Sequence, residues 1–143
     1  MDALAYADAQ KPDLIIDLAT LTGAIVAALG PWAAGLFGDE RYGNLLLQSG
    51  EATGERCWRM PLWDDHQDMM RGDHTDLKNI AGQPWAGSIQ GAAFLKNFVT
   101  RPWVHLDIAG TAWTSDERDY DAKGATGWGV RLLAHFLCNL EKK

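Results

Sequence analysis

The 143-residue chain carries a formal net charge of −6, a pI near 5.0 and 47% hydrophobic residues. Its length fits one domain with a real core over 1–143, and its acidity argues against nucleic-acid and anionic-membrane partners, because no basic face exists to replace counterions. The apolar runs fall far short of the roughly 20 residues that span a bilayer, and no secretory signal is visible, so we expect a cytoplasmic protein without a membrane span.

The N-terminal part of the sequence predicts a helix followed by a strand. Residues 3–9 are rich in Ala and Leu and are followed by Lys11 and Pro12, which end a helix. Nothing precedes this helix to cap it, so we expect that the chain once continued upstream. The apolar run 14–18 indicates a buried parallel strand, and the turn-rich stretch 20–23 would then lie at its carboxyl end, where α/β proteins place ligands.

The next segments fit alternating helices and strands. Residues 24–29 suit either a helix or a strand, and 32–37 suit a strand. A helix is predicted over 44–53, with Asn44 as its N-cap and Gly54 as its stop. A second helix is predicted over 88–99, with Ser88 as its cap, because apolar residues recur at helical spacing.

The C-terminal part predicts one strand and one helix, separated by a polar loop over 114–127. Residues 103–108 alternate, so that Trp103, His105 and Asp107 share one face and the apolar Val104 and Leu106 share the other. The helix is predicted over 129–140, with a stripe formed by Val130, Leu133, Leu137 and Leu140. Strands that alternate with helices indicate an α/β fold.

The density of imidazole and carboxylate groups makes one segment resemble a metal site. His66, Asp68, Asp73, His74 and Asp76 could together bind zinc or manganese. No pair of histidines at i and i+4 occurs, however, and a glycine separates the two histidines. We favour a solvated helix and turn. The distant Cys57 and Cys138 form no CxxC unit and suit two reduced thiols better than a disulfide or a zinc knuckle.

Three other motifs have structural explanations that we prefer. The glycines of 124–129 are in the wrong order for a dinucleotide fingerprint and suit the entry to the last helix. Ser88 lacks the flanking glycines of a nucleophile elbow and suits a helix cap. His105 and Asp107 could belong to a catalytic set, but no activated nucleophile lies near them in sequence, and a half-buried, hydrogen-bonded histidine is commoner.

Four segments together resemble the leucyl (cytosol) aminopeptidase family, in the family's order and at about its spacing. They are DLATLTGA (17–24), DLKN (76–79), HLDIAGTAW (105–113) and KGATG (123–127). The resemblance covers nearly the whole chain. It implies a mixed central sheet flanked by helices, a hexameric assembly, and the removal of N-terminal residues, often leucine, from peptides by two zinc or manganese ions.

The resemblance also implies roles for particular residues. The backbone around Thr20, Leu21 and Gly23 would line the pocket for the first side chain of the substrate, with the Leu21 carbonyl near the free amine. Ala109 and Ala112 would form the opposite wall. Small residues there leave space for a leucine-sized side chain.

The family's metal ligands, in contrast, come from a lysine and an aspartate in an upstream segment and from an Asn-Thr-Asp-Ala-Glu-Gly-Arg motif. Neither segment occurs here, and residues 2–7 resemble the helix that follows that motif. We therefore expect the C-terminal part of a catalytic domain that binds no metal and is inactive by itself. Smaller departures are 83–86, where many members are glycine-rich, and Trp128, where arginine is common. The alternative interpretation is a non-catalytic binding or assembly module derived from the family.

Overall fold

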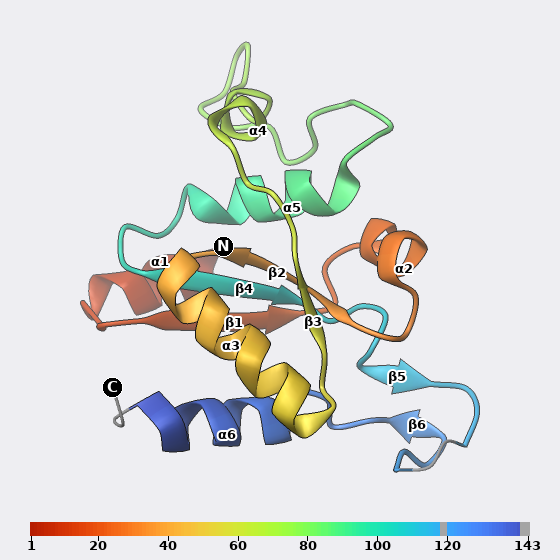
Figure 1. The fold of residues 1–143 in the computed structure, drawn as a ribbon. Coiled ribbons are helices and arrows are strands. Elements are labelled where there is room, and N and C mark those ends of the chain that lie inside the picture. Colours follow the sequence, from red (N-terminus) through yellow and green to blue (C-terminus); the bar gives the residue numbers. More distant parts are fainter. Residues whose placement is uncertain (118–119, 141–143) are drawn as a thin grey trace.

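A four-stranded sheet lies at the centre of the computed structural model, which describes residues 1–117 and 120–140 (Figure 1). The strand order is β1-β4-β2-β3, where the strands are β1 (Ile15–Ala19), β2 (Ala34–Gly38), β3 (Cys57–Arg59) and β4 (Trp103–Asp107). β1 runs parallel to β4, and β3 runs parallel to β2, whereas β2 and β4 are antiparallel. The predicted α/β fold with a mixed sheet is therefore confirmed.

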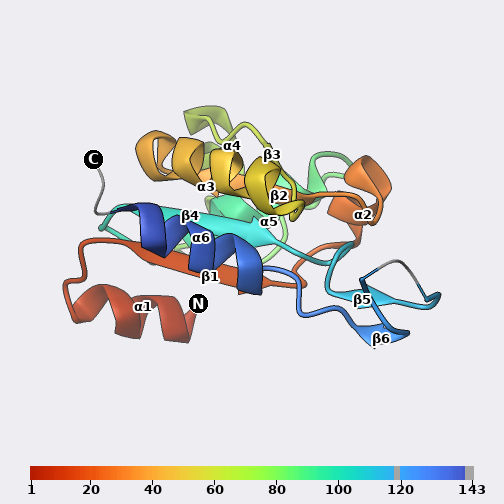
Figure 2. The ribbon, with the colours of Figure 1, turned by 60° about the horizontal axis from the view of Figure 1, so that its bottom comes forward.

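Helices cover both faces of this sheet, as Figure 1 shows for α5 above it and α6 below it. The helices are α1 (Asp2–Ala9), α2 (Gly23–Leu29), α3 (Glu40–Thr53), α4 (Asp64–Asp68), α5 (Gly87–Lys96) and α6 (Val130–Leu140). β5 (Trp113–Thr114) and β6 (Gly124–Ala125) form a separate antiparallel pair. This pair extends away from the sheet in Figure 2.

The alternation of β4 divides the core into two clusters. Trp103 packs with residues of α1 and α5 on one face, whereas Val104 and Leu106 pack with residues of α3 and α6 on the other. Every residue of β4 is buried. The predicted strand with two unlike faces is correct, but both faces are covered because β4 lies between β1 and β2.

The predicted apolar stripe of α6 is correct for Leu133 and Leu140 and wrong for Val130 and Leu137. Leu132 and Phe136 are the residues of α6 that are buried against the sheet, while Val130 is 70% exposed and Leu137 is 60% exposed. Leu133 and Leu140 lie at the margin of the same cluster. Because α6 carries apolar residues around much of its circumference, helical spacing alone does not determine which side faces the core.

Two predicted helix caps are also wrong. α3 begins four residues earlier than Asn44, and its N-cap is Asp39, whose Oδ1 accepts a hydrogen bond of 2.9 Å from the Tyr42 amide. The predicted stop at Gly54 is correct, since this residue has a left-handed φ of 77°. α5 follows Ala86, which has a φ of 56°, and Ser88 is buried inside the helix without capping it.

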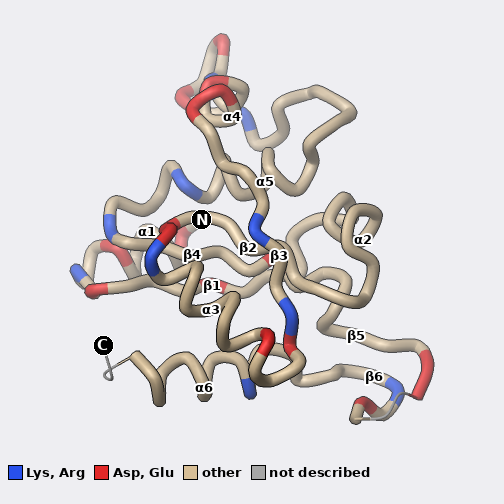
Figure 3. The backbone as a smooth tube through the Cα atoms, viewed as in Figure 1, with Lys and Arg blue, Asp and Glu red and all other residues tan. Residues whose placement is uncertain are grey.

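Charge and thiol chemistry are unevenly distributed. Figure 3 shows acidic residues gathered on α4, whereas α2 carries no charged residue. Both cysteines are free thiols, and Cys138 is exposed. Burial, together with the negative charge of Glu55, raises the pKa of the Cys57 thiol to about 12.

Among the described helices, none is long and apolar enough to cross a membrane.

Asp8 joins α1 to the start of β4. Its carboxylate accepts hydrogen bonds from the Thr100 amide, the Thr100 hydroxyl and the Arg101 amide, at 2.8, 2.7 and 3.0 Å. These bonds, those from Thr100 above all, hold the pKa of Asp8 below its ordinary value of 3.8. The stability they contribute is therefore present above pH 3.8 and is lost as the pH falls through the lower pKa of the folded state.

We expect hydrogen-exchange protection of the Thr100 and Arg101 amides to fall as this carboxylate becomes protonated. Amide exchange followed by NMR between neutral pH and about pH 2.5, with rates corrected for intrinsic pH dependence, measures the effect. In Asp8→Asn the protection should be lower at neutral pH and should lose this pH-dependent step. A step that persists unchanged in Asp8→Asn would show that another group controls the contact.

Candidate functional site

The carboxyl ends of β1 and β4 lie side by side, since the two strands are parallel neighbours and Ala19 is paired with Asp107. The segments that follow them, 20–23 after β1 and 108–112 after β4, are therefore neighbours too. A concave edge of this kind is where open α/β sheets bind ligands. The sequence prediction that the 20–23 loop lies at a strand's carboxyl end is correct.

Asp107 fastens these two segments together. Its side chain is fully buried, and Oδ1 accepts hydrogen bonds from the amides of Leu21, Thr22 and Ala109 at 3.1, 3.4 and 3.3 Å. Oδ2 accepts a hydrogen bond of 2.6 Å from the Thr22 hydroxyl. One buried carboxylate thus holds the backbone of the loop against β4. Moving the loop away would leave these buried donors without an acceptor, which costs free energy.

Thr22 extends this connection into α2. Its hydroxyl oxygen also accepts a hydrogen bond of 3.2 Å from the Ile25 amide, so Thr22 caps α2. This cap settles the ambiguity of residues 24–29 in favour of a helix. The position of α2 and the path of the loop therefore depend on the same threonine.

A cavity of about 470 Å³ lies on one side of the loop, between it, α5 and the segment before α5. Leu21, Ile80 and Phe94 give it apolar surface, while Asn79, Gln83 and Gln90 add polar groups. The Gln90 side-chain amide donates hydrogen bonds to the carbonyls of Gln83 and Trp85, at 3.2 and 2.6 Å, and so holds the outer wall in place. The mostly apolar lining with a few fixed polar groups is typical of ligand sites.

The structure brings most of the predicted substrate-binding residues to this edge. Leu21 lines the cavity, and Ala109 is joined to the loop through Asp107. Thr20 is exposed, and the space where a side chain would begin at Gly23 is open. Ala112 lies further on, in a turn where the Thr111 and Ala112 amides donate hydrogen bonds to the Ile108 carbonyl. Among the described residues, no hydrogen bond links Ala112 to the 20–23 loop.

His105 does not form a catalytic set with Asp107. Its Nδ1 lies 2.7 Å from the carboxylate of Asp17, which also accepts a hydrogen bond of 2.6 Å from the Trp103 indole. The imidazole stacks on Trp103 and on Phe37. A hydrogen-bonded histidine was expected, but His105 is fully rather than half buried.

Three residues of the metal-like segment 66–76, namely His66, Asp68 and Asp73, make local contacts. His66 accepts a hydrogen bond from the Trp63 amide and stacks on the Trp63 ring. Asp68 pairs with Arg71, and Asp73 pairs with Lys78, on the surface. Within residues 1–117 and 120–140, no three His, Cys, Asp or Glu side chains converge as metal ligands.

The sequence did not identify the residues that organise this site. In the sequence Asp107 stands out only as a neighbour of His105, whereas its partners Leu21 and Thr22 lie about eighty-five positions earlier in the chain. Gln90 and Phe94 were expected as ordinary positions of a helix, and their place in the cavity depends on how α5 packs. For Asp107, the available signal was a carboxylate at the end of an otherwise apolar strand.

Comparisons with known proteins show which family this chain resembles. The profile described as "Cytosol aminopeptidase family, catalytic domain" matches residues 1–134. A "Probable cytosol aminopeptidase" of Geobacter sulfurreducens is 54% identical over 138 residues, which are 95% of this chain and 28% of the relative. The Roseiflexus castenholzii protein of that name is 53% identical over 139 residues, 95% of this chain and 28% of the relative. The chain thus spans little more than a quarter of these relatives.

Proposed function

The chain belongs to the cytosol aminopeptidase family, and we propose that it forms the substrate-holding part of a two-metal aminopeptidase that releases N-terminal residues, such as leucine, from peptides. The observation that carries this proposal is the Asp107 carboxylate, which fixes the amides of Leu21 and Thr22. A loop held by its amides leaves its carbonyls available to receive a peptide's free amine.

We assign the first side chain of the substrate to the open space beside Thr20 and Gly23, with Ala109 and Ala112 as the opposite wall. The free room at Gly23 and the link from Ala109 to the loop support this assignment. The neighbouring cavity beside Leu21 would then receive the next side chain of the peptide. Its apolar lining by Ile80 and Phe94 supports a preference for apolar residues there.

The metal ions of the proposed enzyme do not fit the donors found among residues 1–117 and 120–140. Two divalent ions, zinc or manganese, would activate a water molecule and polarise the peptide carbonyl. The described residues offer no converging set of three carboxylate, imidazole or thiolate ligands. We propose that the ligands belong to the remainder of a longer polypeptide, and that residues 1–143 pack against it as a single unit in a cytoplasmic homo-oligomer, a hexamer in the family.

Hydrolysis of a leucyl chromogenic substrate with added manganese tests this function. We expect no turnover from the 143-residue chain alone. We expect chelator-sensitive turnover when the chain is co-expressed with the upstream part of the Geobacter sulfurreducens relative, because the region of that relative that aligns with this chain is 54% identical to it. Co-expression of the same upstream part with Asp107→Ala is the matched control and should restore far less activity.

Two results would contradict the proposal. Metal-dependent turnover that scales with the purified chain alone would show that it carries its own ligands. Stable binding of the upstream part without any restored turnover would instead favour a non-catalytic assembly module.

A further inference from the structure

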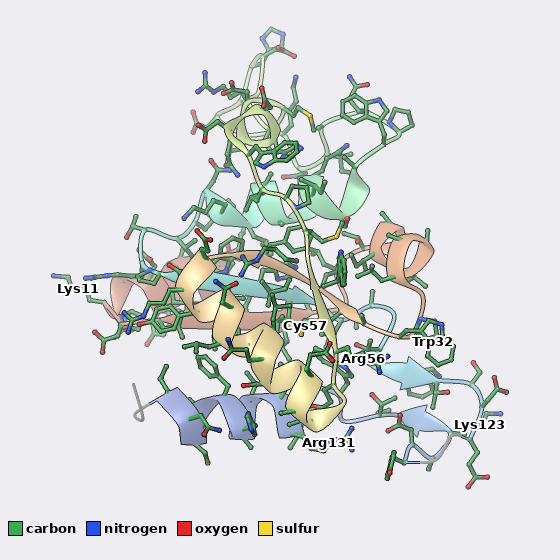
Figure 4. The ribbon with its side chains drawn as sticks, viewed as in Figure 1. Lys11, Trp32, Arg56, Cys57, Lys123 and Arg131 are labelled. Carbon is green, nitrogen blue, oxygen red and sulfur yellow. The ribbon has the colours of Figure 1, made fainter. Side chains whose placement is uncertain are left out.

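A second cavity, of about 260 Å³, shares no lining residue with the cavity beside the 20–23 loop. Its walls come from four parts of the chain: the turn after α2, the turn before β3, residues 111, 120, 121, 126 and 128 of the loop region, and the start of α6. Figure 4 labels Trp32, Arg56 and Arg131, which approach this region from three of these segments. We propose that this cavity binds a free α-amino acid.

Two guanidinium groups give the cavity its positive side. Arg56 is exposed, and its side chain has no hydrogen-bond or ionic partner within the described part of the chain. Arg131 is 53% exposed, and its guanidinium carbon lies 5.9 Å from the centre of the Tyr120 ring. Guanidinium groups recognise carboxylates through paired hydrogen bonds, so this side of the cavity suits a carboxylate.

Glu55 does not neutralise both arginines. It is only 3% exposed, and its Oε2 accepts a hydrogen bond of 2.7 Å from the Leu132 amide in the first turn of α6. Its Oε1 lies 3.4 Å from Arg131 Nε. The buried carboxylate therefore closes the helix terminus and orients Arg131, whereas Arg56 remains available for a ligand.

Asp121 supplies a negative group on the same cavity. It is partly buried, and its carboxylate has no partner among residues 1–117 and 120–140. A phosphate would be repelled by this charge and by Glu55, whereas a zwitterion offers an ammonium group to Asp121 and a carboxylate to Arg56. The charges in the cavity thus favour an amino acid over a simple anion.

Size and lining support the same ligand class. A volume of about 260 Å³ is a little below the roughly 300 to 1,000 Å³ of pockets that bind drug-sized molecules. Trp32, Tyr120 and Trp128 add aromatic surface that can cover an apolar side chain. A free amino acid would be the product of the proposed aminopeptidase, but binding here does not rest on that function.

Isothermal titration of the 143-residue chain with leucine, N-acetyl-leucine and inorganic phosphate tests the proposal. Leucine should bind saturably and more tightly than either competitor. Arg56→Gln should weaken leucine binding about tenfold or more, the loss of a charge-assisted contact. Arg71→Gln makes the same charge change on the distant 64–86 segment and should leave the affinity unchanged. Circular dichroism shows that each variant keeps its fold.

Asp121→Asn tests recognition of the ligand's ammonium group separately from recognition of its carboxylate. It should weaken leucine binding and leave N-acetyl-leucine binding unchanged or stronger, because the acetylated ligand has no ammonium group. Leucine held instead at the 20–23 loop would bind equally to Arg56→Gln and Arg71→Gln, which would overturn the proposal without touching the aminopeptidase function. Tighter binding of phosphate than of leucine, or the absence of saturable leucine binding, would also overturn it.

Discussion

Replacing Asp107 by alanine is expected to lower the free energy of unfolding by about 3 kcal/mol or more and to free the 20–23 loop. The side chain is fully buried and accepts hydrogen bonds from the amides of Leu21, Thr22 and Ala109 and from the Thr22 hydroxyl. Alanine leaves these donors without their acceptor. Urea denaturation measures the loss, and hydrogen exchange at the Leu21 and Thr22 amides measures the release of the loop.

Asp13→Ala is the matched control, because Asp13 is an exposed aspartate outside the helices and strands. It should change the free energy of unfolding by no more than about 0.5 kcal/mol. Equal stability of the two variants, or unchanged exchange at Leu21 and Thr22 in Asp107→Ala, would show that the loop is held in another way.

Replacing Gly38 by alanine is expected to lower the free energy of unfolding as much as Asp107→Ala does, because the new side chain would collide with the backbone. Gly38 ends β2 with a φ of 103°, and a Cβ atom there would lie 2.2 Å from the Trp103 carbonyl oxygen. That oxygen also accepts a hydrogen bond of 2.7 Å from the Asp39 amide. The Gly38 backbone and the Trp103 carbonyl therefore cannot move apart without separating β2 from β4. We expect a loss of about 3 kcal/mol or more in the free energy of unfolding.

Gly54→Ala distinguishes the cost of a positive φ from the cost of a collision between the new Cβ and the backbone. Gly54 also has a positive φ, of 77°, but nothing lies within 4 Å of the position that a Cβ would occupy. This substitution should cost only about 1 kcal/mol, the penalty of the left-handed conformation. Guanidinium denaturation of both variants makes the comparison, and similar losses would refute the collision at Trp103.

The elements were predictable from sequence because their signals are local. Pro12 and Gly54 punctuate the chain, and the alternation from Trp103 to Asp107 predicts a strand without any tertiary information. The errors in the predicted caps and in the buried side of α6 arise where contacts with neighbouring elements determine the structure. Asn44 and Asp39 are both good caps, and the choice between them depends on where β2 ends. The orientation of α6 depends on the sheet that it covers.

The location of the candidate site was predictable from the sequence, but the hydrogen bonds that hold it together were not. The 20–23 loop follows an apolar strand, and such loops bind ligands by a general rule of α/β sheets. Nothing near Asp107 in sequence reveals that its partners are Leu21 and Thr22, because the parallel pairing of β1 with β4 brings them together. Buried carboxylates of this kind become interpretable only once the topology is known.

The last of the four sheet strands to be synthesised, β4, occupies a place inside the sheet, between β1 and β2. While the chain emerges from the ribosome, the β1–β4 ladder therefore cannot close until about residue 107 has left the exit tunnel, whereas the β2–β3 ladder can close earlier. A ribosome stalled before that point would present β1 to the cell without its partner β4, so nascent chains of intermediate length should be the ones that chaperones hold.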